Sequence, residues 1–149
     1  RGRREDPTVY LIDTNAVSEA RKGTRADRGV RRFFDEVVAT GDPVHLSSIT
    51  VGELRRGVES IRHRGDSRQA ALLEAWLLLV LEQYRDNVLD FDAEAAQVWG
   101  RLCVPRPEHA IDKQIAAIAL VNDLTVVTRN TSDFEGTGVR VVDPFEVRE

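Results

Sequence analysis

The sequence is poor in cysteine, histidine and aromatic residues, and each shortage narrows the chemistry that we expect. Cys103 is the only cysteine among 149 residues, so no disulfide can form within the chain. Chains without disulfides are typical of a reducing compartment, so we expect a cytoplasmic protein with Cys103 as an inert core residue. The three histidines are scattered along the sequence. With a single cysteine beside them, a zinc cluster is not expected.

Long hydrophobic runs are also missing. The longest apolar stretch, residues 70–81, is too short to cross a bilayer and contains Glu74. No secretory signal is visible. Apolar residues make up 42% of the chain, which is typical of a globular protein with a sizeable core. We therefore expect one domain over residues 8–145 and no membrane association, with residues 1–7 as an N-terminal tail or a cloning remnant.

The net charge of −4 counts mildly against a nucleic-acid-binding protein, since such proteins are usually basic. Two observations reduce its weight. All basic residues except Lys22 and Lys113 are arginines, whose planar guanidinium binds phosphate well. A site that concentrates carboxylates also lowers the net charge without describing the rest of the surface.

Short apolar runs rich in β-branched residues alternate with segments of helical periodicity. "TVYLI" at 8–12 is typical of a buried strand, whereas Val51, Leu54, Val58 and Ile61 recur at helical spacing. The predicted strands are 8–12, 44–48, 87–91, 124–128 and 138–145, and the predicted helices are 26–39, a segment starting near Thr50, 66–84, 92–103 and 110–122. This alternation predicts a parallel sheet covered by helices on both faces. Such sheets bind ligands at the carboxyl ends of their strands, where the strand order reverses.

Four acids stand at the ends of predicted strands or the beginnings of predicted helices, and each has a simpler structural explanation. Asp13, directly after the first strand, is a possible N-cap of the next helix, although Thr14 and Asn15 are also able to cap. Glu53 lies in Thr50-x-x-Glu53, the pattern of a capping box.

The other two acids are equally ambiguous. Asp112 is a first-turn acid that suits the helix dipole, and Asp133 lies in "NTSD", which has ordinary turn composition. Asp92 resembles a plain N-cap, and we assign it no functional role.

Taken together, the four acids fall on the same side of the predicted sheet. Converging carboxylates repel each other unless a positive charge compensates them, and a divalent cation would do so. No histidine or cysteine lies beside them in the sequence, so oxygen ligands are expected, which favours Mg²⁺ or Mn²⁺ over zinc. Mg²⁺ also prefers phosphate as a further partner.

Four segments that contain these acids resemble the acidic motifs of the PIN-domain family. They are "LIDTNAVSE", "SSITVGELRRGVE", "AIDKQIAAIAL" and "TVVTRNTSDFEGTGVRVVDPF". The chain is most similar to the VapC-type toxin ribonucleases in the subgroup that resembles the FitB protein. This resemblance implies a three-layer α/β/α fold with a five-stranded parallel sheet in the order 3-2-1-4-5.

The resemblance also implies roles for individual residues. Asp13, Asp112 and Asp133 match the principal metal ligands, and Glu53 matches a further ligand or a base that orients water. Asn15 matches a polar residue that steadies the first acid. Thr128 and Asn130 lie beside the fourth acid and are expected to assist it. Lys113 departs from the family, in which a small residue is frequent, and its ammonium is expected to contact either a phosphate or the acidic site.

The implied activity is metal-dependent endoribonuclease action, in which activated water attacks a phosphodiester in line. VapC-type toxins cleave structured RNAs such as tRNA and so inhibit translation. A cognate VapB-type antitoxin holds them inactive, and they form homodimers. Basic residues near the motifs are candidates for RNA binding, although each is also a candidate for a surface ion pair: Arg21, Lys22, Arg55, Arg56 and Arg129.

Two further features leave alternatives open. Aromatic residues are only 6% of the chain, so recognition of RNA shape is more plausible than base stacking. The helix predicted at 66–84 is apolar almost all round. Either the sheet and neighbouring helices bury it completely, or part of it forms a dimer or antitoxin surface.

Three competing functions remain. A haloacid-dehalogenase-type phosphatase also begins with an acid at a strand end, but it needs a second acid where this chain has Asn15. A response-regulator receiver needs a phospho-accepting aspartate at a central strand end, whereas Glu53 lies within a predicted helix. A non-catalytic dimeric interaction module is the third possibility, if the four acids serve only as caps.

Overall fold

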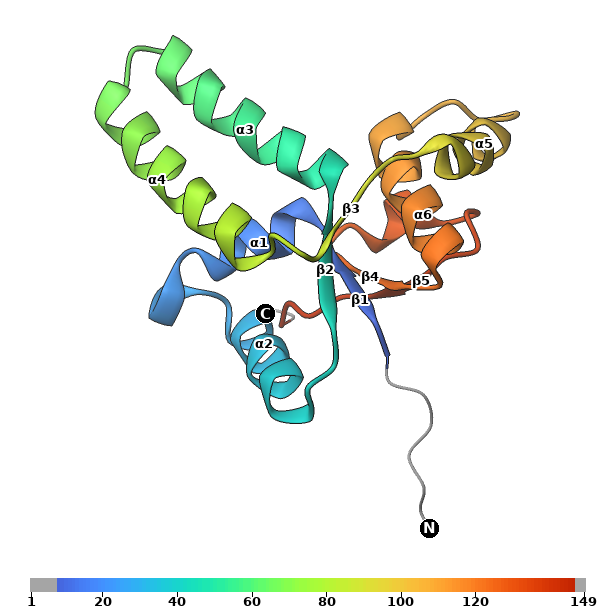
Figure 1. Ribbon diagram of the computed structural model, residues 1–149, viewed down its shortest axis with the longest axis horizontal. Coiled ribbons are helices and arrows are strands. Elements are labelled where there is room, and N and C mark those ends of the chain that lie inside the picture. The colour runs from blue at the N-terminus through green and yellow to red at the C-terminus, as the bar shows by residue number, and fades with distance from the viewer. Residues whose placement is uncertain (1–7, 147–149) are drawn as a thin grey trace.

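A computed structural model describes residues 8–146 and shows five parallel strands in the order β3-β2-β1-β4-β5 (Figure 1). Residues 1–7, for which we expect a tail, lie outside the described part. The strands are β1 (Tyr10–Ile12), β2 (Val44–Ser47), β3 (Val88–Leu89), β4 (Thr125–Val127) and β5 (Arg140–Val142). The order confirms the predicted topology and places β1 beside β4 at the point where the strand order reverses.

Helices cover both faces of the sheet, as predicted. They are α1 (Thr14–Ala20), α2 (Arg28–Thr40), α3 (Ser48–His63), α4 (Ser67–Gln83), α5 (Ala93–Leu102) and α6 (Ala110–Asn122), with 3-10 turns η1 (Gly23–Arg25) and η2 (Thr131–Phe134). Leu11 and Val126 face α5 and α6, whereas Ile12 and Val127 face α1, α3 and α4. All four side chains are fully buried. Successive strand residues thus serve two separate hydrophobic clusters, as expected of a sheet buried on both sides.

Two details of the sequence interpretation are wrong. Helix α3 begins at Ser48 instead of near Thr50, because the Ser47 hydroxyl accepts the Thr50 N–H at 3.0 Å and caps the helix. Thr50 is therefore inside the helix, and the capping box that was the structural alternative to a functional role for Glu53 does not form. Cys103 is half-buried at the end of α5 and is not a core residue. Asp92 does cap α5, as predicted.

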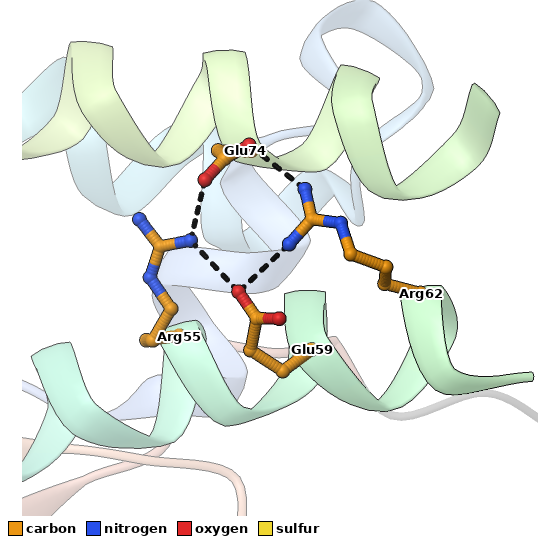
Figure 2. Close-up of polar contacts among 4 residues, drawn as sticks. All are labelled: Arg55, Glu59, Arg62 and Glu74. Carbon is orange, nitrogen blue, oxygen red and sulfur yellow. Dashed lines mark hydrogen bonds and ion pairs between the residues drawn. The ribbon is translucent and has the colours of Figure 1, made fainter. Parts of the chain in front are cut away.

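Helices α3 and α4 form a hairpin that is bridged by four charged side chains (Figure 2). Arg55 of α3 contacts Glu74 of α4 at 2.7 Å and Glu59 at 3.2 Å. Arg62 contacts the same two carboxylates, each at 2.8 Å. We call this set the α3–α4 ionic cluster. It connects the two helices along the outer side of the hairpin, and it occupies Arg55, one of the predicted RNA-binding residues.

Helix α4 is only partly covered by its own chain. Leu77, Val80 and Tyr84 are buried against the sheet side, whereas Leu72 is 61% exposed and Leu79 is 70% exposed. Of the two alternatives for this helix, complete burial within the chain is therefore wrong. Within residues 8–146, no helix combines the length and the apolar character that crossing a membrane requires.

A close contact at the start of α2 generates a stability prediction. Gly29 lies against the C-terminal segment, and a Cβ added there would stand 2.1 Å from the carbonyl oxygen of Pro144. We expect Gly29→Ala to lower the free energy of unfolding by about 1–3 kcal/mol, because the backbone must move to relieve the clash. Gly57, in the middle of α3, has open space around it. The control Gly57→Ala should raise the free energy of unfolding by about 0.5–1 kcal/mol. Urea denaturation measures both, and equal stability of the two variants would contradict the contact.

Candidate active site

Asp13 lies at the end of β1 and is nearly inaccessible, with 3% of its surface exposed. Its N–H donates to the Val127 carbonyl at 2.9 Å, which continues the pairing of β1 with β4. One carboxylate oxygen accepts the Thr14 N–H at 2.8 Å and so caps α1, and the other accepts the Thr128 hydroxyl at 2.8 Å. The sequence argument against a capping role for Asp13 was therefore wrong, since this residue caps α1 and also faces the other acids.

A polar network fixes Asp13 from the β4 side. The Asn15 amide donates to the Thr128 hydroxyl oxygen at 3.1 Å and approaches the Asp13 carboxylate at 3.5 Å. Its carbonyl oxygen accepts the N–H of Arg129 at 3.0 Å. Thr128 is fully buried and also accepts the N–H of Asn130 at 3.0 Å. Asn15 and Thr128 thus contact the first acid, whereas Asn130 takes part through its main chain.

Glu53 projects from the second turn of α3 toward the start of α1. Its carboxylate accepts the Thr14 hydroxyl at 2.7 Å, and its other oxygen lies 3.8 Å from the Arg56 guanidinium. Thr14 was not among the predicted site residues, although its position directly after Asp13 made it a candidate for contact with the acids. Through its N–H and its hydroxyl, Thr14 joins the first and second acids.

Asp112 and Asp133 meet His109 at the start of α6. The Nδ1 atom of His109 lies 3.9 Å from an Asp112 oxygen and 3.7 Å from an Asp133 oxygen. One ligand atom from each residue lies within 4.8 Å of the others, a spacing suitable for a shared metal ion. The expectation that no histidine lies beside the acids is therefore wrong. The sequence did carry a signal for this contact, because His109 precedes Asp112 by three residues, which is about one helical turn.

The electrostatics show that all four acids share one site. Burial is the largest cause that raises the pKa of Asp112 to about 6; the charges of Asp13, Asp133 and Glu53 contribute in the same direction, and the nearby His109 opposes the shift. Burial likewise raises the pKa of Asp13 above its ordinary value, with smaller contributions from Glu53 and Asp133, while hydrogen bonds from Thr128 and Thr14 oppose the shift. The structure therefore brings together the four acids that the sequence predicts.

This donor set fits a divalent cation. Burial and the neighbouring carboxylates raise the pKa of Asp13 and of Asp112, and a positive charge placed between the acids would favour their ionised forms. Lys113 does not provide that charge. It is buried, and its ammonium donates to the carbonyl oxygen of Arg106. The expected contact with a phosphate or with the acids is therefore replaced by a contact within the chain.

The five predicted RNA-binding residues make different contacts and do not form one group. Arg56 and Arg129 adjoin the acids through Glu53 and Asn15, and the Arg129 guanidinium lies 4.4 Å from the centre of the Phe145 ring. Arg21 lies over Trp76 at 5.9 Å, and Lys22 contacts Glu19 at 3.0 Å. Arg55 belongs to the α3–α4 ionic cluster. An open depression of about 940 Å³ lies elsewhere, over α1 and α2, and none of the four acids lines it.

Comparison with known proteins assigns the family. The PIN domain matches residues 10–138, and the chain belongs to the PIN domain family. It is 33% identical to the plasmid stability protein StbB of Pseudomonas syringae pv. tomato, over 93% of this chain and 99% of the relative. It is 31% identical to the toxin FitB of Neisseria gonorrhoeae, over 92% and 99%. It is 34% identical to the tRNA(fMet)-specific endonuclease VapC of Shigella flexneri, over 87% and 92%.

Solved structures agree with this assignment. The crystal structure of FitAcB from Neisseria gonorrhoeae matches with a TM-score of 0.77 at 30% identity, covering 91% of this chain and 97% of that one. A DNA-bound VapBC from Salmonella typhimurium matches with a TM-score of 0.66 at 27% identity, covering 92% and 98%. The resemblance to the PIN-domain family and the expected sheet order are thereby confirmed.

The raised pKa of Asp112 gives a prediction for stability against pH. Between the ordinary aspartate pKa of 3.8 and the raised pKa of about 6, the folded metal-free chain retains a proton that the unfolded chain releases. The contribution of Asp112 to folding stability therefore falls as the pH rises through this window and stays low above it. Asp112→Asn cannot ionise, so we expect it to melt about 3–6 °C above the parent at neutral pH, with the difference vanishing toward about pH 4. Melting curves in EDTA measure this difference.

Asp66 offers the matched control for this experiment. It caps α4 at the tip of the α3–α4 hairpin, and asparagine caps a helix as well as aspartate does. Asp66→Asn should therefore follow the parent curve at both ends of the pH range. If Asp112→Asn also follows the parent, the carboxylates do not repel each other as the structure implies.

Proposed function

We propose that this chain is a divalent-metal-dependent endoribonuclease that acts as the toxin of a VapBC-type toxin–antitoxin pair. The observation that carries this proposal is the convergence of Asp13, Glu53, Asp112 and Asp133 near the ends of β1 and β4, where burial and the neighbouring acids raise the pKa of Asp13 and of Asp112. The names of two relatives support it, since one is a toxin and the other a tRNA(fMet)-specific endonuclease. The expected substrate is tRNA or another structured RNA, whose cleavage inhibits translation in the cytoplasm.

We expect the acids to have different roles because their side chains differ in exposure to solvent. Asp13 forms the floor of the site, because it is almost completely buried. Asp112 and Asp133 form the rim, with side chains 23% and 30% exposed, so a phosphodiester can approach them from solvent. We assign these three as metal ligands. The bound ion, Mg²⁺ or Mn²⁺, would act as a Lewis acid toward the phosphodiester.

Glu53 is suited to act either as a further ligand or as the base that orients the attacking water. Thr14 holds one of its oxygens by a hydrogen bond of 2.7 Å, which fixes the carboxylate while the second oxygen stays accessible to other partners. Asn15 and Thr128 act as positioning residues, because their hydrogen bonds fix the orientation of Asp13. Preorganised carboxylates need not rearrange when substrate binds.

The competing functions have less support. A haloacid-dehalogenase-type phosphatase needs an acid at position 15, where the Asn15 amide instead donates toward Thr128 and Asp13. A non-catalytic module would use the four acids as caps, but among them only Asp13 accepts a helix-capping hydrogen bond in residues 8–146. A response-regulator receiver is disfavoured because Glu53 lies within α3 instead of at the end of a central strand.

We further propose a cognate VapB-type antitoxin and a homodimer as partners. The exposed leucines of α4 provide apolar surface for such a contact, since Leu72, Leu78 and Leu79 are each more than half exposed. Both partners follow from the resemblance to VapC-type toxins, which antitoxins hold inactive.

Single substitutions of the acids test the catalytic assignment. Asp13→Asn and Asp112→Asn should each reduce cleavage of a tRNA mixture in Mg²⁺ or Mn²⁺ by at least about 100-fold, since metal binding contributes several kcal/mol to the transition state. Asparagine retains the capping bond of Asp13, so the fold should persist, as circular dichroism would show. Asp92→Asn, at a plain N-cap, is the matched control and should cleave like the parent. Parent-like rates in both site variants would refute the proposal.

Basic residues beside the acids test the RNA contact. Arg129→Gln and Arg56→Gln should each weaken RNA binding and reduce the slope of log affinity against log salt by about 0.7–1, because each removes one phosphate contact. Arg85, which is exposed and pairs with Glu82, provides the control Arg85→Gln. Fluorescence anisotropy with labelled tRNA at several salt concentrations measures the slope. An unchanged slope in both site variants would exclude these two arginines from RNA binding.

A further inference from the structure

We propose that His109 is a direct nitrogen ligand of the divalent ion, and that it biases the site toward transition-metal ions such as Mn²⁺ over Mg²⁺. The proposal rests on the proposed function, because it assigns an additional ligand to the same site. It goes beyond the four acids, which supply only oxygen atoms.

The distances suit a shared ion better than hydrogen bonds. His109 Nδ1 lies 3.7 Å from Asp133 and 3.9 Å from Asp112, which is too long for a hydrogen bond with either carboxylate. Ligand atoms that each stand about 2.1 Å from one ion lie between about 3.0 Å and 4.2 Å apart, depending on the angle between them. Both separations fall inside this interval, so little movement would be needed to place an ion among the three side chains.

The imidazole is also available for this role. His109 occupies the N-cap position of α6, yet its side chain makes no capping hydrogen bond. The side chain is 52% exposed, so an ion can reach it from solvent. The backbone of His109 adopts a left-handed conformation, with φ 57° and ψ 44°. Asparagine tolerates this conformation better than most residues, which makes His109→Asn the least disruptive substitution.

The chemistry of the donors predicts the metal preference. Mg²⁺ prefers oxygen ligands and retains several waters, whereas imidazole is a common ligand of transition metals. A site in which one imidazole joins the proposed carboxylate ligands should therefore gain more affinity from the histidine for Mn²⁺ than for Mg²⁺. The alternative is that His109 contributes only a positive charge beside the acids, without bonding to the ion.

Mn²⁺ is a suitable probe because it is paramagnetic. Electron spin-echo spectra of the full chain with Mn²⁺ should show coupling to a directly bound ¹⁴N nucleus. The coupling should disappear in His109→Asn and persist in His63→Asn, which alters an exposed histidine at the end of α3. Titration should show that His109→Asn weakens Mn²⁺ binding by about tenfold or more and Mg²⁺ binding by less than about threefold.

The outcomes separate this proposal from the proposed function. Absence of nitrogen coupling in the parent overturns the histidine assignment whether or not the variant folds, and so does coupling that persists in His109→Asn. Asp112→Asn is titrated in parallel. If it loses Mn²⁺ binding while His109→Asn binds like the parent, the acidic site stands and only the histidine proposal fails. If Asp112→Asn binds Mn²⁺ like the parent, or the parent binds none, the proposed function fails as well.

Discussion

Repulsion among four carboxylates is the constraint on which the rest of this site depends. Folding brings Asp13, Glu53 and Asp112 together with Asp133, and burial, reinforced by the charges of the neighbouring acids, raises the pKa of Asp13 and of Asp112. The fold opposes this shift at the floor of the site, where the hydroxyl of Thr128 and the N–H of Thr14 both donate to Asp13. The protein therefore retains a negative site whose remaining charge is available to a cation.

Parallel topology explains why residues so distant in sequence meet. Strands β1 and β4 are paired in register, with Ile12 opposite Val127, so Asp13 and Thr128 follow at the same edge. Helix α3 begins directly after β2, which places Glu53 near that edge without an intervening loop. The α3–α4 ionic cluster lies farther along the hairpin, where it joins α3 to α4 (Figure 2). Helix α3 thus carries both the proposed catalytic acid Glu53 and the side chains that bridge it to α4.

Local patterns predicted most of this arrangement, because strands and helix starts leave periodic signals. Leu11 and Ile12 read as a buried strand, and the acid after them could be placed at a sheet edge from sequence alone. Contacts that depend on distant residues left no such signal. Arg55 reaches Glu74 across 19 residues, and the carbonyl that binds Lys113 belongs to a loop. The left-handed turn at His109 is likewise a property of the folded backbone, so the sequence offered only the three-residue spacing to Asp112 as a sign that the imidazole lies beside the acids.

Asp13 caps a helix and also faces the other acids, two roles that the sequence presents as alternatives. A carboxylate offers about four lone pairs on its two oxygens, and hydrogen bonds from the Thr14 N–H and the Thr128 hydroxyl occupy one on each. The remaining lone pairs suffice for a metal ion, even with the longer approach of Asn15. The Thr14 bond, which caps α1, and the Thr128 bond both favour the charged form of Asp13 against its burial. Capping is therefore part of what makes this buried acid usable as a ligand.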